Sequence, residues 1–186
     1  MLTLLLACGT APEGPVYALQ ELGSLPEFSL VDQEGAVVTR ETLLGKPMLG
    51  DFMFTKCPDI CPMLSTRMAA VGAQYGDRLQ LLSFSVDPAN DTPAALRAYG
   101  ERFGATYPGW RFLTGDTAAM RAVVVGGFKL LMERVPAADE RPETVLHGSR
   151  FVLLDAGGVI RAYPDPDVAG EIEGYVNALL AATSGG

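Results

Sequence analysis

The order of apolar and polar positions along the chain predicts strands alternating with helices. Two nearly continuous apolar runs, 47–54 and 79–86, have the length of strands and the pattern of strands covered on both faces of a sheet. Asp51, in the middle of the first run, is the exception. Between the two runs, apolar residues recur at helical spacing over 59–75, and Gly76 ends the pattern. We therefore expect a buried strand, a helix and a second buried strand.

The flanking segments extend this alternation and complete one domain. They predict a hairpin over 28–39 with a turn at Gly35, a helical turn over 41–44, a helix from 93 to about 103 capped by Asp91 or Thr92, a strand over 110–113, a helix from 116 or 117 to about 125, an extended segment over 128–135, a polar loop over 136–143, strands over 146–154 and 159–163, and a closing helix over 168–182. This order predicts an α/β fold: a thioredoxin-like three-layer α/β/α sandwich with a central mixed sheet and an N-terminal hairpin.

The first 24 residues have a different character. The sequence Leu5-Leu6-Ala7-Cys8 resembles a lipobox, in which the cysteine takes the lipid, although the apolar stretch is short and no basic segment precedes it. Residues 10–23 carry Pro and Gly with little periodicity. We expect 1–24 to be a lipoprotein-type signal remnant and flexible tether, and 25–186 to be the folded domain, extracytoplasmic and held at the bacterial cell membrane by a lipid on Cys8. The alternative is a short apolar N-terminus with an incidental cysteine.

Composition restricts the partners. The chain has 186 residues, of which 48% are apolar, so it can bury a core; 14 Lys and Arg against 22 Asp and Glu give a net charge of −8. That charge repels a phosphate backbone, which makes nucleic acid an unfavourable partner, and it favours cations or a basic protein.

The candidate chemistry lies directly after the first buried strand, where Cys57 and Cys61 are four residues apart. On a helix this spacing puts both side chains on one face, which suits a disulfide or two thiolates on one metal. A helix N-terminus also stabilises a thiolate, and Pro58 fits the first turn. Since a disulfide across so short a loop stabilises little, we expect the pair to be functional.

His147 is the single histidine of the chain. His147 lies at the start of residues 149–154, the main part of the expected 146–154 strand. In a thioredoxin-like sheet this strand lies beside the strand that leads to the cysteines, so the imidazole can reach the sulfurs. Two thiolates and an imidazole suit copper, Cu(I) or Cu(II); zinc would also accept them with a fourth ligand. Asp87 fits equally well as a carboxylate that hydrogen-bonds and orients His147 and as a turn residue before Pro88.

Three sequence blocks occur in a fixed order: Phe54-Thr55-Lys56-Cys57-Pro58-Asp59-Ile60-Cys61-Pro62, then Val86-Asp87-Pro88 with Asp91-Thr92-Pro93, then His147-Gly148-Ser149 with Phe151-Val152-Leu153-Leu154-Asp155. Together they resemble the Sco/SenC family over residues 25–182. The resemblance implies a membrane-tethered, thioredoxin-like copper-binding protein that helps assemble the dinuclear copper A centre of cytochrome c oxidase. By this resemblance Cys57, Cys61 and His147 are the copper ligands, and the cysteines also take part in thiol–disulfide chemistry.

Three functions compete. The first is a copper metallochaperone whose partner is the copper A-bearing subunit of cytochrome c oxidase, with other periplasmic copper chaperones or thiol reductants as further partners. The second is a thiol–disulfide oxidoreductase in which Cys57 reacts with a partner and Cys61 resolves the mixed disulfide. The Cys-x-x-x-Cys spacing differs from the Cys-x-x-Cys of thioredoxin-type enzymes, which favours the first. A peroxiredoxin-like peroxidase ranks last.

Overall fold

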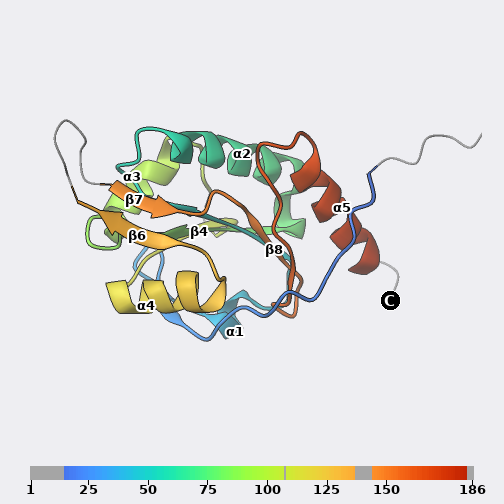
Figure 1. Cartoon of the computed structure of the whole chain (residues 1–186), viewed down its shortest axis with the longest axis horizontal. Helices are drawn as coiled ribbons and strands as arrows, with labels where there is room; N and C mark the ends of the chain where they lie inside the picture. Colours follow the sequence, from blue (N-terminus) through green and yellow to red (C-terminus); the bar gives the residue numbers. More distant parts are fainter. Residues whose placement is uncertain (1–14, 107, 137–143, 184–186) are drawn as a thin grey trace, which may run out of the picture.

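The computed structural model describes residues 15–106, 108–136 and 144–183, and its centre is a five-stranded mixed sheet (Figure 1). The strand order is β5-β4-β3-β8-β9. The first three strands are parallel to one another, and the last two run antiparallel to their neighbours. Their bounds are β3 (Met48–Met53), β4 (Gln80–Ser85), β5 (Trp110–Leu113), β8 (Val152–Leu154) and β9 (Ile160–Ala162).

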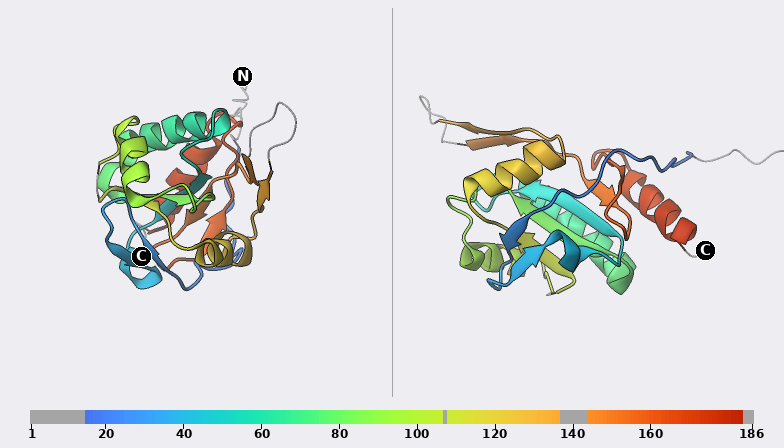
Figure 2. Two further views of the ribbon diagram at one scale, coloured as in Figure 1. Left: turned by 90° about the vertical axis from the view of Figure 1, so that its left-hand side faces the viewer. Right: turned by 90° about the horizontal axis from the view of Figure 1, so that it is seen from below.

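Helices cover both faces of this sheet, as two further views show (Figure 2). On one side lie α2 (Ile60–Tyr75) and α3 (Pro93–Glu101), with α5 (Glu171–Thr183) beside the end of α2, where the Tyr75 hydroxyl donates to Asn177 at 3.0 Å. On the other side lie α1 (Arg40–Leu43) and α4 (Thr117–Arg121), which passes into a π-helical turn, η2 (Ala122–Gly127). A short 3-10 turn, η1 (Gly76–Arg78), follows α2. The expected three-layer α/β/α fold is confirmed.

Every residue of β3 is buried, because successive side chains of this central strand enter the two opposite helical layers. On the α4 side the Phe52 ring stacks on Phe84 and meets Phe128 edge-on, with centroids 5.7 and 5.4 Å apart. On the opposite side, α2 approaches β4 so closely that a Cβ on Gly72 would lie 2.9 Å from the Leu81 side chain. Both faces of the sheet are therefore core.

The expected N-terminal hairpin is present as β1 (Ser29–Val31) and β2 (Val37–Thr39). Gly35 takes a φ of 78° in the turn, and Asp32 Oδ1 accepts the backbone N–H groups of Glu34 and Ala36. The Gln33 side chain bonds the backbone of β5 through Trp110 O and Phe112 N, which fixes the hairpin against the edge of the main sheet.

The prediction of one continuous strand over 146–154 is wrong. The segment divides into β7 (Thr144–His147) and β8, because residues 148–151 leave the ladder and the Phe151 N–H bonds Pro164 O instead. β7 pairs with β6 (Met132–Val135) in a separate antiparallel ribbon beside the main sheet (Figure 1). His147 therefore ends this β6–β7 ribbon and does not begin a strand of the main sheet.

The chain contacts the domain before the expected boundary at Leu25. The Gln20 and Leu22 N–H groups bond the β9 carbonyls of Arg161 and Ile160, at 3.0 and 2.9 Å. The Tyr17 ring meets Tyr175 of α5 edge-on, with centroids 5.1 Å apart. The lipid site expected at Cys8 lies outside the described residues. Within the described ranges, no helix combines the length and apolar character needed to cross a membrane.

Candidate metal and thiol site

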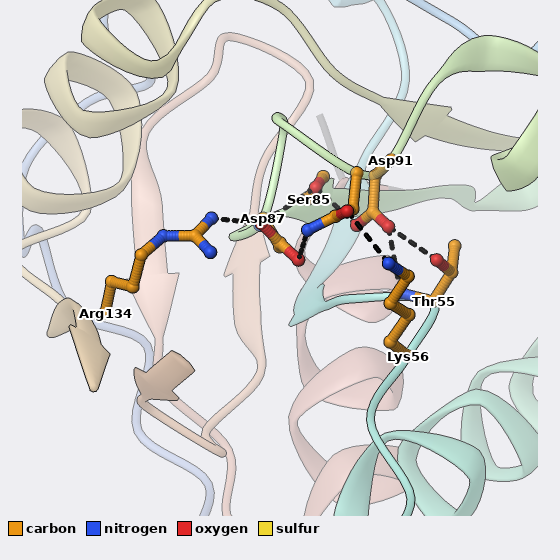
Figure 3. A network of polar contacts seen from close by, with 7 residues as sticks. Thr55, Lys56, Ser85, Asp87, Asp91 and Arg134 are labelled. Atoms are coloured by element: carbon orange, nitrogen blue, oxygen red, sulfur yellow. Dashed lines mark hydrogen bonds and ion pairs between the residues drawn. The ribbon is translucent and has the colours of Figure 1, made fainter. Parts of the chain in front are cut away.

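The loop that carries the cysteines runs from the end of β3 to the start of α2 and is fixed by Asp91. The Thr55 N–H and hydroxyl both donate to Asp91 Oδ1, at 3.1 and 2.6 Å, and the Ser85 hydroxyl donates to Oδ2 at 2.6 Å (Figure 3). Asp91 is buried, and it is Thr92 that caps α3, by accepting the Ala95 N–H. From the sequence only a capping role is predicted for Asp91; its cross-link between the cysteine loop and β4 is not.

The two cysteines are free thiols in different environments. Cys57 is partly exposed in the loop, whereas Cys61 is fully buried in the first turn of α2. The Cys61 N–H donates to Cys57 Sγ at 3.4 Å. This is the interaction expected of a sulfur held at the start of a helix, where backbone N–H groups have no partner within the helix.

These environments separate the acidities of the two thiols. The Cys61 thiol donates to Cys57 and is the main cause that lowers the pKa of Cys57 to about 4; contacts with His147 and with the backbone N–H groups of Cys61 and Asp59 also lower it, against an opposing effect of burial. The same hydrogen bond, and then burial, raise the pKa of Cys61 far above its ordinary value. Cys57 is therefore the thiolate at neutral pH, and Cys61 retains its proton.

His147 reaches the cysteines from the β6–β7 ribbon. Its Nε2 lies 3.6 Å from Cys61 Sγ, across 86 positions of sequence, and its Nδ1 lies 3.0 Å from the Gly148 carbonyl oxygen. With Nδ1–H donated to that carbonyl, the lone pair of Nε2 faces the sulfur. The Phe54 ring meets the imidazole edge-on with centroids 5.9 Å apart and limits its rotation. The structure thus brings Cys57, Cys61 and His147 together.

Asp87 has other partners than the expected His147. It forms an ion pair with Arg134 of β6, and its Oδ2 accepts the Asn90 side-chain N–H at 2.8 Å (Figure 3). Its carbonyl accepts the N–H groups of Asn90 and Asp91, as a turn residue does. Because both ring nitrogens of His147 face Cys61 and Gly148, Asp87 acts on the site only through the ribbon that it anchors.

A hollow of about 300 Å³ opens beside the loop that carries the cysteines. Its lining includes Phe54 and Lys56 from the loop, Asp87 and Asn90 after β4, and Arg134 of the ribbon. Lys56 Nζ donates to Asn90 Oδ1 at 2.9 Å across it. Both cationic and anionic side chains therefore line this hollow.

The donor atoms match a soft metal in kind and nearly in position. Metal–sulfur and metal–nitrogen bonds of about 2.3 and 2.0 Å, at trigonal angles, put the two donors about 3.7 Å apart, close to the observed Cys61–His147 separation. In the part of the chain that the structure describes, no three His, Cys, Asp or Glu side chains already surround one ion position. Three-coordinate binding by Cys57, Cys61 and His147 would therefore require these side chains to rearrange.

A cysteine pair at the junction of a central strand and its helix, faced by an imidazole, defines a thioredoxin-like protein with a thiol or metal site. The chain belongs to the SCO1/SenC family, whose sequence profile matches residues 19–180.

Individual relatives agree with this assignment. The chain is 30% identical to the "SCO1 protein homolog" of Bacillus subtilis over 137 residues, which are 72% of this chain and 69% of that protein. It is similar to the structure of Bradyrhizobium japonicum ScoI with copper bound, at 30% identity and a TM-score of 0.68, covering 86% of this chain and 99% of that one. It is also similar to a SCO1/SenC family lipoprotein from Bacillus anthracis, at 25% identity and a TM-score of 0.73, covering 89% and 96% of the two chains.

Proposed function

We propose that the protein is a copper metallochaperone that binds one copper ion through Cys57, Cys61 and His147 and assists assembly of the copper A centre of cytochrome c oxidase. The observation that carries the proposal is the 3.6 Å approach of His147 Nε2 to Cys61 Sγ. The chain offers two sulfurs and one imidazole nitrogen close to one another, a donor set that suits Cu(I) and tolerates Cu(II). The similarity to ScoI with copper bound supports copper as the metal.

The two cysteines would have different parts in acquiring and releasing the ion. Cys57 is already a thiolate and partly exposed, so it meets an incoming ion or an outgoing recipient ligand first. Cys61 lies deeper, and together with the partly exposed His147 it completes the site once the Cys61 proton has left. Because Cys57 is accessible while Cys61 is buried, the ion can pass to a recipient by stepwise exchange of thiolates without becoming solvated.

The recipient in this proposal is the copper A-bearing subunit of the oxidase, and copper comes from another periplasmic chaperone. Thiol reductants keep Cys57 and Cys61 reduced, and the net charge of −8 disfavours nucleic acid. Residues 1–24, with a lipid on Cys8, would tether the domain of residues 25–186 to the outer side of the cytoplasmic membrane. The lipoprotein description of the Bacillus anthracis neighbour supports this tether.

A thiol–disulfide oxidoreductase that reduces the cysteines of the copper-receiving partner is the second candidate function. The asymmetry of the cysteine pair favours it, because a partly exposed thiolate and a buried thiol are what attack and resolution of a mixed disulfide require.

Anaerobic copper titration of the reduced protein tests the first candidate. We expect one copper per chain, with a thiolate-to-Cu(II) charge-transfer band that is lost in His147→Ala. Leu146→Ala is the matched control, because Leu146 precedes His147 on the same strand and is 49% exposed. The metallochaperone is supported if the wild type and the control bind one copper per chain and His147→Ala binds with at least tenfold lower affinity. If His147→Ala binds copper as tightly as the wild type, the oxidoreductase becomes the favoured function.

A further inference from the structure

Another hollow, of about 500 Å³, lies at the end of the main sheet opposite the cysteines. Its lining includes Lys46, which precedes β3, Gln80 at the start of β4 and Trp110 at the start of β5, so it lies at the amino ends of the three parallel strands. The cysteine loop follows the carboxyl end of β3, about 20 Å away along the strand. The hollow is therefore separate from the thiol and metal site.

One face of α2 carries only small residues, and this face forms a wall of the hollow. Ala69, Gly72, Ala73 and Gly76 all line it, and they recur at intervals of three and four positions, which places them on one side of the helix. Gly72 lets α2 approach β4, since a Cβ there would lie 2.9 Å from the Leu81 side chain. Because no long side chain projects from this face, the space beside that contact stays open.

The remaining lining is largely apolar. It includes the buried side chains of Leu79, Leu81 and Trp110, together with Phe103, which packs on the Tyr99 ring with centroids 5.0 Å apart. A volume of about 500 Å³ lies within the range of roughly 300–1,000 Å³ that is typical of small-molecule sites. The hollow therefore suits the apolar body of a small organic molecule.

Two cationic side chains, Lys46 and Arg111, also line the hollow. Gln80 positions the Arg111 guanidinium: the Gln80 Nε2 donates to the Leu43 carbonyl at 2.7 Å, and its Oε1 accepts the Arg111 Nη1–H at 3.3 Å. Lys46 is exposed to solvent. Asp77 is the one anionic side chain among the described lining residues, so the lining is positive on balance in a chain whose net charge is −8. This local charge favours an anionic group.

We propose that this hollow binds a small organic acid with a single negative charge. The apolar body of the ligand lies against Leu81 and Trp110, and its carboxylate or sulfonate pairs with Lys46 and Arg111. A multiply charged phosphate fits less well, because Asp77 and the net charge of the chain oppose each further negative charge. The inference goes beyond the copper and thiol chemistry and does not depend on it.

Trp110 is the only tryptophan of the chain, so its fluorescence reports occupation of the hollow. The probe is 8-anilinonaphthalene-1-sulfonate, a monoanion with an apolar ring system that accepts energy from tryptophan. When it is titrated into the full chain, we expect it to quench Trp110 emission to saturation at one probe per chain. N-phenyl-1-naphthylamine has the same rings without the sulfonate and measures the apolar contribution alone.

Ala73→Leu should weaken the binding of both probes at least about tenfold, because the added side chain fills the hollow. The matched control is Ala70→Leu, the same change at another exposed position of α2 that does not line the hollow. It should bind both probes as the wild type does.

Lys46→Gln tests the charge without altering the shape of the apolar lining. It should weaken the binding of the sulfonate about threefold to fivefold and leave the binding of the neutral amine unchanged, because only the sulfonate has a charge to pair. Arg67→Gln is the matched control, since it removes a cation from α2 outside the hollow, and it should leave the affinities for both probes unchanged.

The absence of saturable quenching of Trp110, or equal affinities of the wild type and Ala73→Leu, would overturn the proposal. A Lys46→Gln variant that binds the sulfonate as tightly as the wild type would also overturn it, because the hollow would then have no preference for an acid. Residue 107 lies outside the described residues, so the titration is repeated in Tyr107→Ala. Binding seen only in that variant would show that the natural chain accepts no ligand there, which equally contradicts the proposal.

Discussion

Arg134 of β6 forms an ion pair with Asp87, which follows β4 and is almost completely buried. This pair joins the β6–β7 ribbon, which carries His147, to the main sheet, which carries the cysteines. A further tie is the Arg121 side chain, which donates to the Met132 carbonyl at 2.8 Å. The imidazole is therefore positioned by contacts that are separate from those that position the sulfurs.

Arg134→Gln should weaken copper binding by about fivefold while the protein stays folded. A partly exposed ion pair contributes about 1 kcal/mol at most, and that is the free energy available for holding the ribbon in place. Competition with a Cu(I) chelator measures the change. Arg150→Gln is the matched control, because it breaks the Arg150–Asp165 ion pair, whose two residues lie outside β6 and β7. Equal affinities of the two variants would contradict a positioning role for Arg134.

Cys57 should react with iodoacetamide at a rate that is nearly constant between pH 6 and 8. Its pKa is lowered to about 4, so the thiolate already dominates at pH 6, whereas the rate of an ordinary thiol rises about tenfold per pH unit in this range. Mass spectrometry of the alkylated peptide follows the reaction. In Cys61→Ala the largest cause of the lowered pKa is lost, so a pH-dependent rate should return. A wild-type rate that rises steeply with pH would disagree with the pairing of the two thiols.

Asp51→Asn should stabilise the protein at pH 8 more than at pH 5. Burial raises the folded-state pKa of Asp51 from 3.8 to about 7, so the folded state binds more protons than the unfolded state between these values. In the wild type, the contribution of Asp51 to the free energy of unfolding is fully present below about pH 4 and is lost as the pH rises through 7. Asn has no charge at any of these pH values, so it has no such loss. Between pH 5 and pH 8 the difference is at most about 2.7 kcal/mol, because about two pH units separate pH 5 from the folded-state pKa. Urea unfolding at both pH values measures it, and a pH-independent difference would refute the assignment.

Asp91→Ala should destabilise the fold by about 2–4 kcal/mol and also weaken copper binding. The substitution leaves the Thr55 N–H and hydroxyl and the Ser85 hydroxyl without their acceptor, and it releases the loop before Cys57. Thr92→Ala is the neighbouring control: it removes the cap of α3, at about 1 kcal/mol, and leaves the loop bonded. Urea unfolding and copper titration are the measurements. Loss of stability with unchanged copper affinity would show that the loop keeps its shape without Asp91.

The sequence predicted those features that are carried by local pattern. The alternation of strands and helices, the hairpin at Gly35 and the joint location of Cys57, Cys61 and His147 follow from periodicity, turn residues and recognisable blocks. The separate β6–β7 ribbon did not follow, because the apolar run over 146–154 is continuous and only pairing with 132–135, together with the backbone bond of Phe151 to Pro164, divides it.

The polar contacts around the site could not be predicted from the sequence either. Asp91 bonds Thr55 across 36 positions of sequence. The effect of the Asp51 charge on the pKa of Cys61 arises only when α2 packs on β3. A composition or spacing argument treats each of these aspartates as a cap or an irregularity in a strand. Their roles depend on which distant groups the fold places beside them.

The segment that follows Tyr17 also protects an edge of the main sheet. β9 is the last strand in the sheet order, and Gln20, Leu22 and Gly23 take up its outward backbone groups through bonds to Arg161 and Ile160. A chain shortened to begin at Leu25 would expose these groups, and an uncovered strand edge is a template on which a second molecule can pair. Such a truncated protein should self-associate, so a shortened version that keeps this edge covered has to begin before Gln20.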